Sequence, residues 1–217
     1  MTTLAEASQK STSALKEISE TPLLDTQVLL AHILGKTRSW VLAHPEQQLS
    51  PQEIEEFNRS IKKLKEGIPL PYVLGQWEFF GLEFTLTPDV LIPRPETELL
   101  VEQAIDWLYA NPERRWAADV GTGSGCIAVT LAHKIEDLKL TAGDISMEAL
   151  RVAITNAMRH SVEQRIHFVQ ADLTPPSENP YDLICANLPY IPSSELIKLQ
   201  VFGREPSLAL DGGRDGL

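Results

Sequence analysis

The sequence predicts an α/β fold in which a parallel β-sheet follows a small helical domain and a β-hairpin. The strongest observation is a short apolar run at 116–120 that leads into glycines at alternate positions and then into a helical apolar repeat. Further apolar runs at 138–145, 166–171 and 181–186 have the length of buried strands, and a helical repeat separates the first two. Strands joined by helices predict right-handed crossovers, with ligand-binding residues at the carboxyl ends of the strands.

The composition is that of an ordinary folded protein with one large or two modest domains. The chain has 217 residues, 43% of them apolar, and a net charge of −11, which argues against a broad electrostatic grip on nucleic acid. Two cysteines, Cys126 and Cys185, allow no disulfide framework, and the histidines follow no metal-ligand pattern. No signal peptide and no apolar stretch of about 18 residues is present, so we expect a cytoplasmic protein with no membrane partner and no metal.

Residues 1–70 are predicted to form the helical domain. One apolar run in this segment is closed by Gly35, a common residue just after a helix. A second run follows Ser50 and Glu53, which are spaced as a capping box, and Pro51 occupies the first helical position. We expect a structural or docking module without chemistry of its own.

Residues 71–94 change to a two-residue alternation on both sides of Gly81 and predict a β-hairpin linker. The aromatic residues of the hairpin are expected to pack against it, and a ligand shelf is the alternative. The α/β domain is then expected to span 95–217 and to begin with a helix.

The glycine turn after the first strand predicts a nucleotide site. Gly121, Gly123 and Gly125 lack the Cβ atoms that would hold a ligand away from the backbone. A dinucleotide fingerprint requires glycine where this chain has Cys126, and no lysine follows in the position that a P-loop requires. The Gly-x-Gly-x-Gly pattern after an aspartate instead resembles the first motif of S-adenosylmethionine-dependent methyltransferases. Another nucleotide, or an ordinary glycine turn, is the alternative.

Two aspartates end the next two predicted strands. Asp144 is placed to accept the hydroxyl groups of a ribose, and a helix-capping role before Ser146 is the alternative. Asp172 is placed to meet an adenine amino group, and an ordinary turn aspartate is the alternative.

The fourth predicted strand ends in Asn187-Leu188-Pro189-Tyr190, which suits the methylation of an amide nitrogen. Such a nitrogen is a poor nucleophile because its lone pair is delocalised, so a site must hold its N–H groups with acceptors. The Asn187 side chain and the Leu188 carbonyl supply two acceptors. Tyr190 can stack on the flat amide or on a base, and Pro189 stiffens the turn.

Several segments together resemble the PrmC/HemK family of peptide chain release factor glutamine methyltransferases. They are the runs 77–84, 90–101, 119–128, 144–146, 187–191 and 205–216. The resemblance implies a Rossmann-like methyltransferase domain of seven strands, and we expect this chain to stop before the last of them. It also implies methyl transfer from S-adenosylmethionine to the side-chain nitrogen (N5) of the glutamine in the Gly-Gly-Gln motif of release factors.

The resemblance also implies site residues. The cofactor is expected at Gly121, Thr122, Gly123, Ser124, Gly125, Asp144, Asp172, Leu173 and Asn187, and the substrate glutamine at Asn187, Leu188, Pro189 and Tyr190. Leu188 replaces the usual first proline of the family motif, and only its carbonyl is needed for the amide contact.

Two other hypotheses remain from the sequence. An adenine-N6 methyltransferase acting on DNA or RNA would use the same Asn-x-Pro-Tyr turn on a flipped base, but the acidic composition argues against it. A non-catalytic module would bind S-adenosylmethionine or a release factor without turnover.

Overall fold

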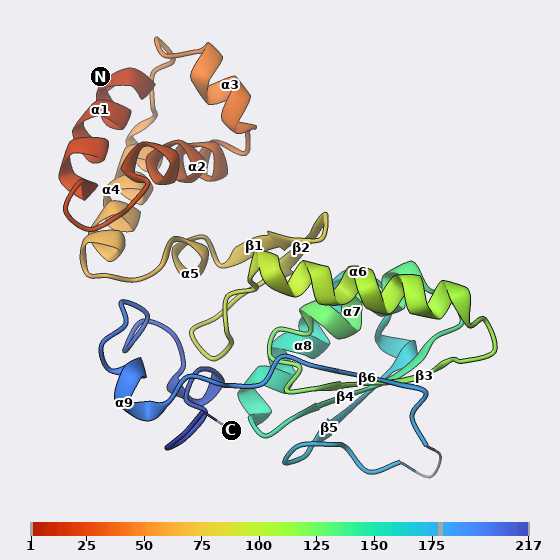
Figure 1. The fold of residues 1–217 in the computed structure, drawn as a ribbon. Coiled ribbons are helices and arrows are strands. Elements are labelled where there is room, and N and C mark those ends of the chain that lie inside the picture. The colour runs from red at the N-terminus through yellow and green to blue at the C-terminus, as the bar shows by residue number, and fades with distance from the viewer. Residues whose placement is uncertain (1, 178–179, 217) are drawn as a thin grey trace. The chain divides into compact units, whose positions relative to one another are not determined.

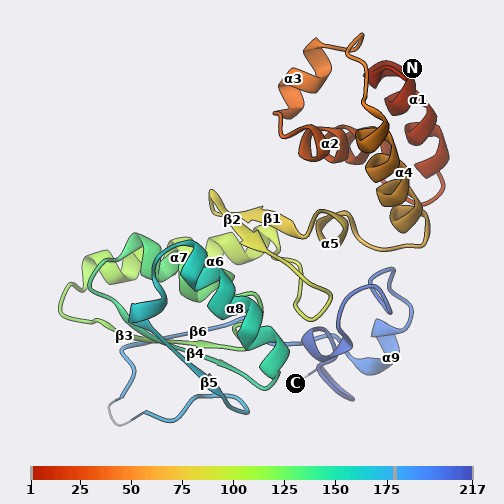
Figure 2. The ribbon, with the colours of Figure 1, turned by 180° about the vertical axis from the view of Figure 1, so that it is seen from behind.

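The computed structural model describes residues 2–177 and 180–216. The chain divides into two compact units, Met1–Leu74 and Gly75–Leu217. Figure 1 labels the elements of both, and Figure 2 shows them from behind.

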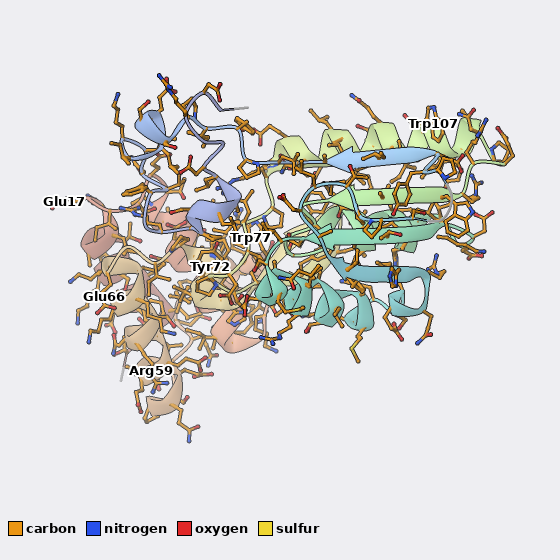
Figure 3. All side chains as sticks on the ribbon, turned by 90° about the horizontal axis from the view of Figure 1, so that it is seen from below. Glu17, Arg59, Glu66, Tyr72, Trp77 and Trp107 are labelled. Atoms are coloured by element: carbon orange, nitrogen blue, oxygen red, sulfur yellow. The ribbon has the colours of Figure 1, made fainter. Side chains whose placement is uncertain are left out.

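The described residues of the first unit form helices, joined by loops and by one isolated β-bridge between Thr3 and Gln48. Its helices are α1 (Leu4–Leu15), α2 (Pro22–Leu34), α3 (Arg38–Ala43), α4 (Pro51–Lys65) and α5 (Leu70–Leu74). Gly35 ends α2 in the left-handed conformation (φ 58°), and both hydrogen bonds of the predicted capping box between Ser50 and Glu53 are present at α4. The side chains of Glu17, Arg59 and Glu66, which Figure 3 labels, are exposed.

The second unit begins with the predicted hairpin, formed by β1 (Gln76–Phe79) and β2 (Leu82–Thr85). Its turn consists of Phe80 (φ 52°) and Gly81 (φ 75°), and two successive positive φ angles match the twist of a tight antiparallel hairpin. The carboxylate of Glu98 accepts a hydrogen bond from the Phe80 backbone N–H at 2.7 Å. This bond holds a non-glycine residue in a conformation that side chains disfavour.

The hairpin aromatics Phe79 and Phe84 are buried in the core of this unit and do not line its cavity. Their packing role, predicted from the sequence, is confirmed.

A parallel four-stranded sheet forms the centre of the second unit, in the order β5-β4-β3-β6. The strands are β3 (Trp116–Val120), β4 (Lys139–Asp144), β5 (Ile166–Gln170) and β6 (Leu183–Ala186). Helices α6 (Pro95–Ala110), α7 (Cys126–Lys134) and α8 (Met147–Arg159) lie together on one face (Figures 1 and 2). Figure 3 shows the four strands side by side, with Trp107 near the end of α6. The shorter elements are η1 (Glu163–Arg165), α9 (Ser193–Leu196) and η2 (Ser207–Ala209).

The predicted strands are confirmed with small changes at their ends. The fourth begins at Leu183 rather than at 181, and just before it the Asp182 carboxylate accepts hydrogen bonds from the backbone N–H groups of Arg115 and Trp116. The described residues supply four of the seven strands that the resemblance implies.

Asn156 on α8 joins the hairpin to the glycine turn. Its side chain is fully buried, and its Oδ1 accepts from the Thr85 backbone N–H at 2.7 Å. Its Nδ2 donates to the carbonyls of Thr85 at 3.0 Å and Ser124 at 2.8 Å. One side chain therefore satisfies three backbone groups from two segments that are far apart in the sequence.

We expect Asn156→Ala to lower the free energy of unfolding of this unit by about 2–4 kcal/mol, because it leaves buried backbone groups unpaired. Denaturant unfolding followed by tryptophan fluorescence measures this, since Trp77, Trp107 and Trp116 all lie in the unit. The matched control is Thr155→Ala at the exposed neighbouring position, which should change stability by less than about 0.5 kcal/mol. Equal effects of the two substitutions would contradict the role of Asn156.

Candidate active site

A cavity of about 460 Å³ opens at the carboxyl ends of the strands in the second unit, where the sequence predicts a ligand. Its walls come from five places: the segment before α6 with its first turn, the glycine turn with the start of α7, the ends of β4 and β5 with the start of α8, the turn after β6, and residues 206–211. The predicted site residues that line it are Gly121, Thr122, Gly123, Ser124, Asp144, Asp172, Leu173, Asn187, Leu188 and Pro189.

Gly125 and Tyr190 are the two predicted site residues outside this lining. Gly125 is the N-cap of α7 (φ 79°), and a Cβ there would lie 3.0 Å from the Cβ of Ala153 on α8. The glycine thus allows α7 and α8 to pack closely. Tyr190 is 71% exposed beside the cavity.

The carboxylate of Asp119, the fourth residue of β3, holds the glycine turn in place. The Oδ2 of Asp119 accepts from the Thr122 hydroxyl at 2.6 Å and from the Ala128 backbone N–H at 3.2 Å, so one carboxylate fixes both the turn and the start of α7. Its Oδ1 is buried and has no hydrogen-bond partner among the described residues. Burial raises the pKa of this carboxyl to about 6, although the bonds from Thr122 and Ala128 lower it.

The Asp144 carboxylate points its oxygens at the same turn. Oδ2 accepts from the Gly123 backbone N–H at 2.8 Å, and Oδ1 accepts from the Ser146 backbone N–H at 2.9 Å. The N-cap of α8 is Ser146, whose hydroxyl accepts from the Ala149 N–H, so the alternative of a capping Asp144 is wrong. Each carboxylate oxygen keeps acceptor capacity for a ligand, because a carboxylate offers about four lone-pair sites.

Asp172 and Leu173 form an exposed wall of the cavity just after β5. Leu173 has a positive φ of 60°, a conformation that leucine rarely adopts. The loop that follows rests on β4 at Gly143, where a Cβ would lie 2.6 Å from the Cγ of Pro175.

The turn after β6 lies directly against the glycine turn. A Cβ on Gly121 would come within 3.0 Å of the Leu188 side chain. Asn187 donates from Nδ2 to the Thr97 hydroxyl of α6 at 3.2 Å. Residues 210–212 support this turn through two contacts. Ile191 pairs with their backbone, and a Cβ on Gly212 would lie 2.8 Å from the Tyr190 Cα.

An ion pair that sequence reasoning missed joins two walls of the cavity. Arg94, just before α6, bonds to the Oε1 of Glu205 at 2.5 Å, and Glu205 Oε2 accepts from the Ile92 backbone N–H at 3.1 Å. The Glu205 side chain is 3% exposed. Both residues lie in segments that resemble the family's motifs, and this was the signal in the sequence that could have identified them. Nothing in the local sequence indicates that they pair.

The two thiols near the site stay protonated. Burial raises the pKa of Cys126 and of Cys185 to about 12, and the Asp119 carboxylate adds to each increase. Burial therefore disfavours the thiolate form of both residues.

Two family models match the chain, the "PrmC N-terminal domain" over residues 6–75 and the "Methyltransferase small domain" over residues 96–201. A curated relative from Chlorobaculum tepidum, named release factor glutamine methyltransferase, is 42% identical over 91% of this chain and 70% of its own length. The chain belongs to the release factor glutamine methyltransferase family. Relatives of the same name from Koribacter versatilis and Coxiella burnetii are 40% and 37% identical, over 94% and 100% of this chain and 75% and 78% of their own lengths.

Among solved structures, this member of the release factor glutamine methyltransferase family is similar to the catalytic domain of human METTL16 in complex with an RNA hairpin. The TM-score is 0.44 and the identity 17%, over 77% of this chain and 56% of that one. Within the described residues, no helix is long and apolar enough to cross a membrane, and no cluster of side chains could hold a metal ion.

We expect Asp119→Asn to change how stability depends on pH. The folded carboxyl binds a proton at a higher pH than the unfolded one, so wild type should gain stability relative to the variant as pH falls from about 7 to about 4, by at most about 3 kcal/mol. Denaturant unfolding at several pH values measures the difference.

Asp182→Asn is the control for this series, because hydrogen bonds from Trp116 and Arg114 lower the pKa of Asp182. Its stability difference from wild type should stay flat above about pH 5 and shrink at lower pH. A flat difference for Asp119→Asn would show that burial does not hold a proton on that carboxyl.

Proposed function

We propose that this protein transfers a methyl group from S-adenosylmethionine to the side-chain amide nitrogen (N5) of the glutamine in the Gly-Gly-Gln motif of a peptide chain release factor. The observation that carries the proposal is the shared cavity, in which Gly121 of the glycine turn lies against Leu188 of the Asn187 turn. A methyl donor and an amide acceptor that occupied these two turns would meet. The family to which the chain belongs supports the choice of substrate.

The cofactor is assigned to the glycine side of the cavity. The Asp144 carboxylate, oriented by the N–H groups of Gly123 and Ser146, accepts the two ribose hydroxyls. Asp172 and Leu173 form the wall for the adenine, and the glycine turn lets the donor approach the backbone. The residues present fit the cofactor because acceptors and apolar walls surround a cavity of its size class.

The substrate amide is assigned to the Asn187 side. The Asn187 side-chain oxygen and the Leu188 carbonyl accept its two N–H groups, and the exposed Tyr190 ring covers the amide at the mouth of the cavity. When bound, S-adenosylmethionine would supply an electrophilic methyl group, whose carbon–sulfur electron pair would return to sulfur as the substrate nitrogen bonds to the methyl carbon. The nitrogen then loses one proton to water. Positioning supplies most of the catalysis, because no strong base is required.

We propose that the first unit, Met1–Leu74, helps to dock the release factor in the cytoplasm, since it matches the family's N-terminal domain and contributes no residue to the cavity lining. No direct readout of nucleic acid is proposed.

Incubation with labelled S-adenosylmethionine tests the function. Label should enter a release factor and be lost when the glutamine of its Gly-Gly-Gln motif is replaced by alanine. DNA and RNA are included as competing acceptors. Label on nucleic acid, or undiminished label on the alanine variant, would reject the proposal, and binding of S-adenosylmethionine without any transfer would favour the non-catalytic module.

Asn187→Ala and Asp144→Ala should distinguish the role of the substrate side of the cavity from that of the cofactor side. Asn187→Ala removes an acceptor aimed at the nucleophile, so turnover should fall about 100-fold or more while S-adenosylmethionine affinity changes less than about 3-fold. Asp144→Ala removes charged hydrogen bonds to the ribose, so affinity should fall about 10-fold to 100-fold. Calorimetric titration and initial rates measure both. Comparable losses of affinity in the two variants would mean that Asn187 mainly serves the cofactor.

A further inference from the structure

We propose that Thr97 is a positioning residue that holds the Asn187 carboxamide in the orientation needed for transfer. The inference rests on the proposed function and adds a residue to it. Thr97 lies in the first turn of α6, is 7% exposed, and lines the same cavity as Asn187. Its hydroxyl accepts from the Asn187 Nδ2 at 3.2 Å across 90 residues of sequence.

The chemistry requires one particular face of the Asn187 amide. The substrate nitrogen presents N–H groups, so Asn187 must turn its oxygen toward the substrate and its own NH₂ elsewhere. The Thr97 hydroxyl accepts from that NH₂ and so leaves the side-chain oxygen free for the substrate. Without the Thr97 hydroxyl, the Asn187 side-chain amide could rotate and turn its NH₂ group toward the N–H groups of the substrate, where two donors would face each other.

Thr97 can act in this way because its own position is fixed. Its backbone N–H donates to the Arg94 carbonyl at 3.0 Å, and the Arg94 guanidinium is paired with the buried Glu205. Glu98, the next residue, holds the hairpin turn at Phe80. A β-branched side chain also has few rotamers in a helix, so the hydroxyl needs little further ordering.

A comparison of hydroxyl and methyl at position 97 tests the inference. Thr97→Val keeps the shape and removes the hydroxyl, Thr97→Ala removes the whole group, and Thr97→Ser keeps the hydroxyl. With release factor and labelled S-adenosylmethionine, we expect Thr97→Val and Thr97→Ala to lower kcat about 10-fold to 100-fold with KM for S-adenosylmethionine within about 2-fold. Thr97→Ser should retain kcat within about 3-fold.

Thr130→Val is the matched control, because Thr130 is fully buried in α7 outside the cavity lining, and it should leave kcat unchanged. Adding Thr97→Val to Asn187→Ala should cost no more than about 2-fold, since Thr97 acts through Asn187. Thermal unfolding identifies any variant that fails to fold, and the alanine and serine variants then decide.

Equal kcat in Thr97→Val and wild type would overturn the inference and leave the proposed function standing. Loss of kcat in Thr97→Ser equal to that in Thr97→Val would also overturn it, as would a KM that rises as much as kcat falls. Absence of transfer by the wild-type protein would overturn the proposed function and this inference together.

Discussion

The parallel pairing of β3 with β6 is the constraint on which the site depends. It aligns Val120 with Ala186, the last residues of the two strands, although they are 66 positions apart in the sequence. Because both strands end at the same level, the glycine turn and the Asn187 turn leave the sheet side by side. The two turns therefore form adjoining walls of one cavity.

Buried polar side chains keep those turns in place. Asp119 fixes the glycine turn from within the sheet, Asn156 fixes its far end from α8, and Glu205 fixes the segment that leads into α6. Each satisfies backbone N–H or C=O groups that have no partner in a helix or strand, which a purely apolar core could not do. The Asp119 carboxyl shows the cost of this arrangement, since its second oxygen has no partner among the described residues.

Local patterns were sufficient to predict the elements of the fold. The strands, the capping box at Ser50 and the hairpin around Gly81 follow from periodicity and turn chemistry over a few residues. The order of the strands and the shared cavity agree with the rule that ligands bind at the carboxyl ends of parallel strands. The sequence therefore located the glycine turn, the strand ends and the Asn187 turn, but not the walls formed by the segment before α6 and by residues 206–211.

Contacts across long stretches of sequence could not be predicted. The bond from Asn187 to Thr97 and the pair between Arg94 and Glu205 span 90 and 111 residues, and no local spacing encodes either. The alternative role considered for Asp144, capping α8, belongs to Ser146, because its side chain reaches the free N–H of Ala149. Sequence reasoning identified the residue types that chemistry needs but not the residues that orient them.

The contact between Gly143 and Pro175 places the loop after β5 against β4. The loop that carries Asp172 and Leu173 can settle onto β4 because that strand exposes bare backbone at one point. A methyl group at position 143 would lie 2.6 Å from the Pro175 Cγ, so the loop would have to move away from β4. The position of the cavity wall formed by Asp172 and Leu173 thus depends partly on an atom that the neighbouring strand lacks.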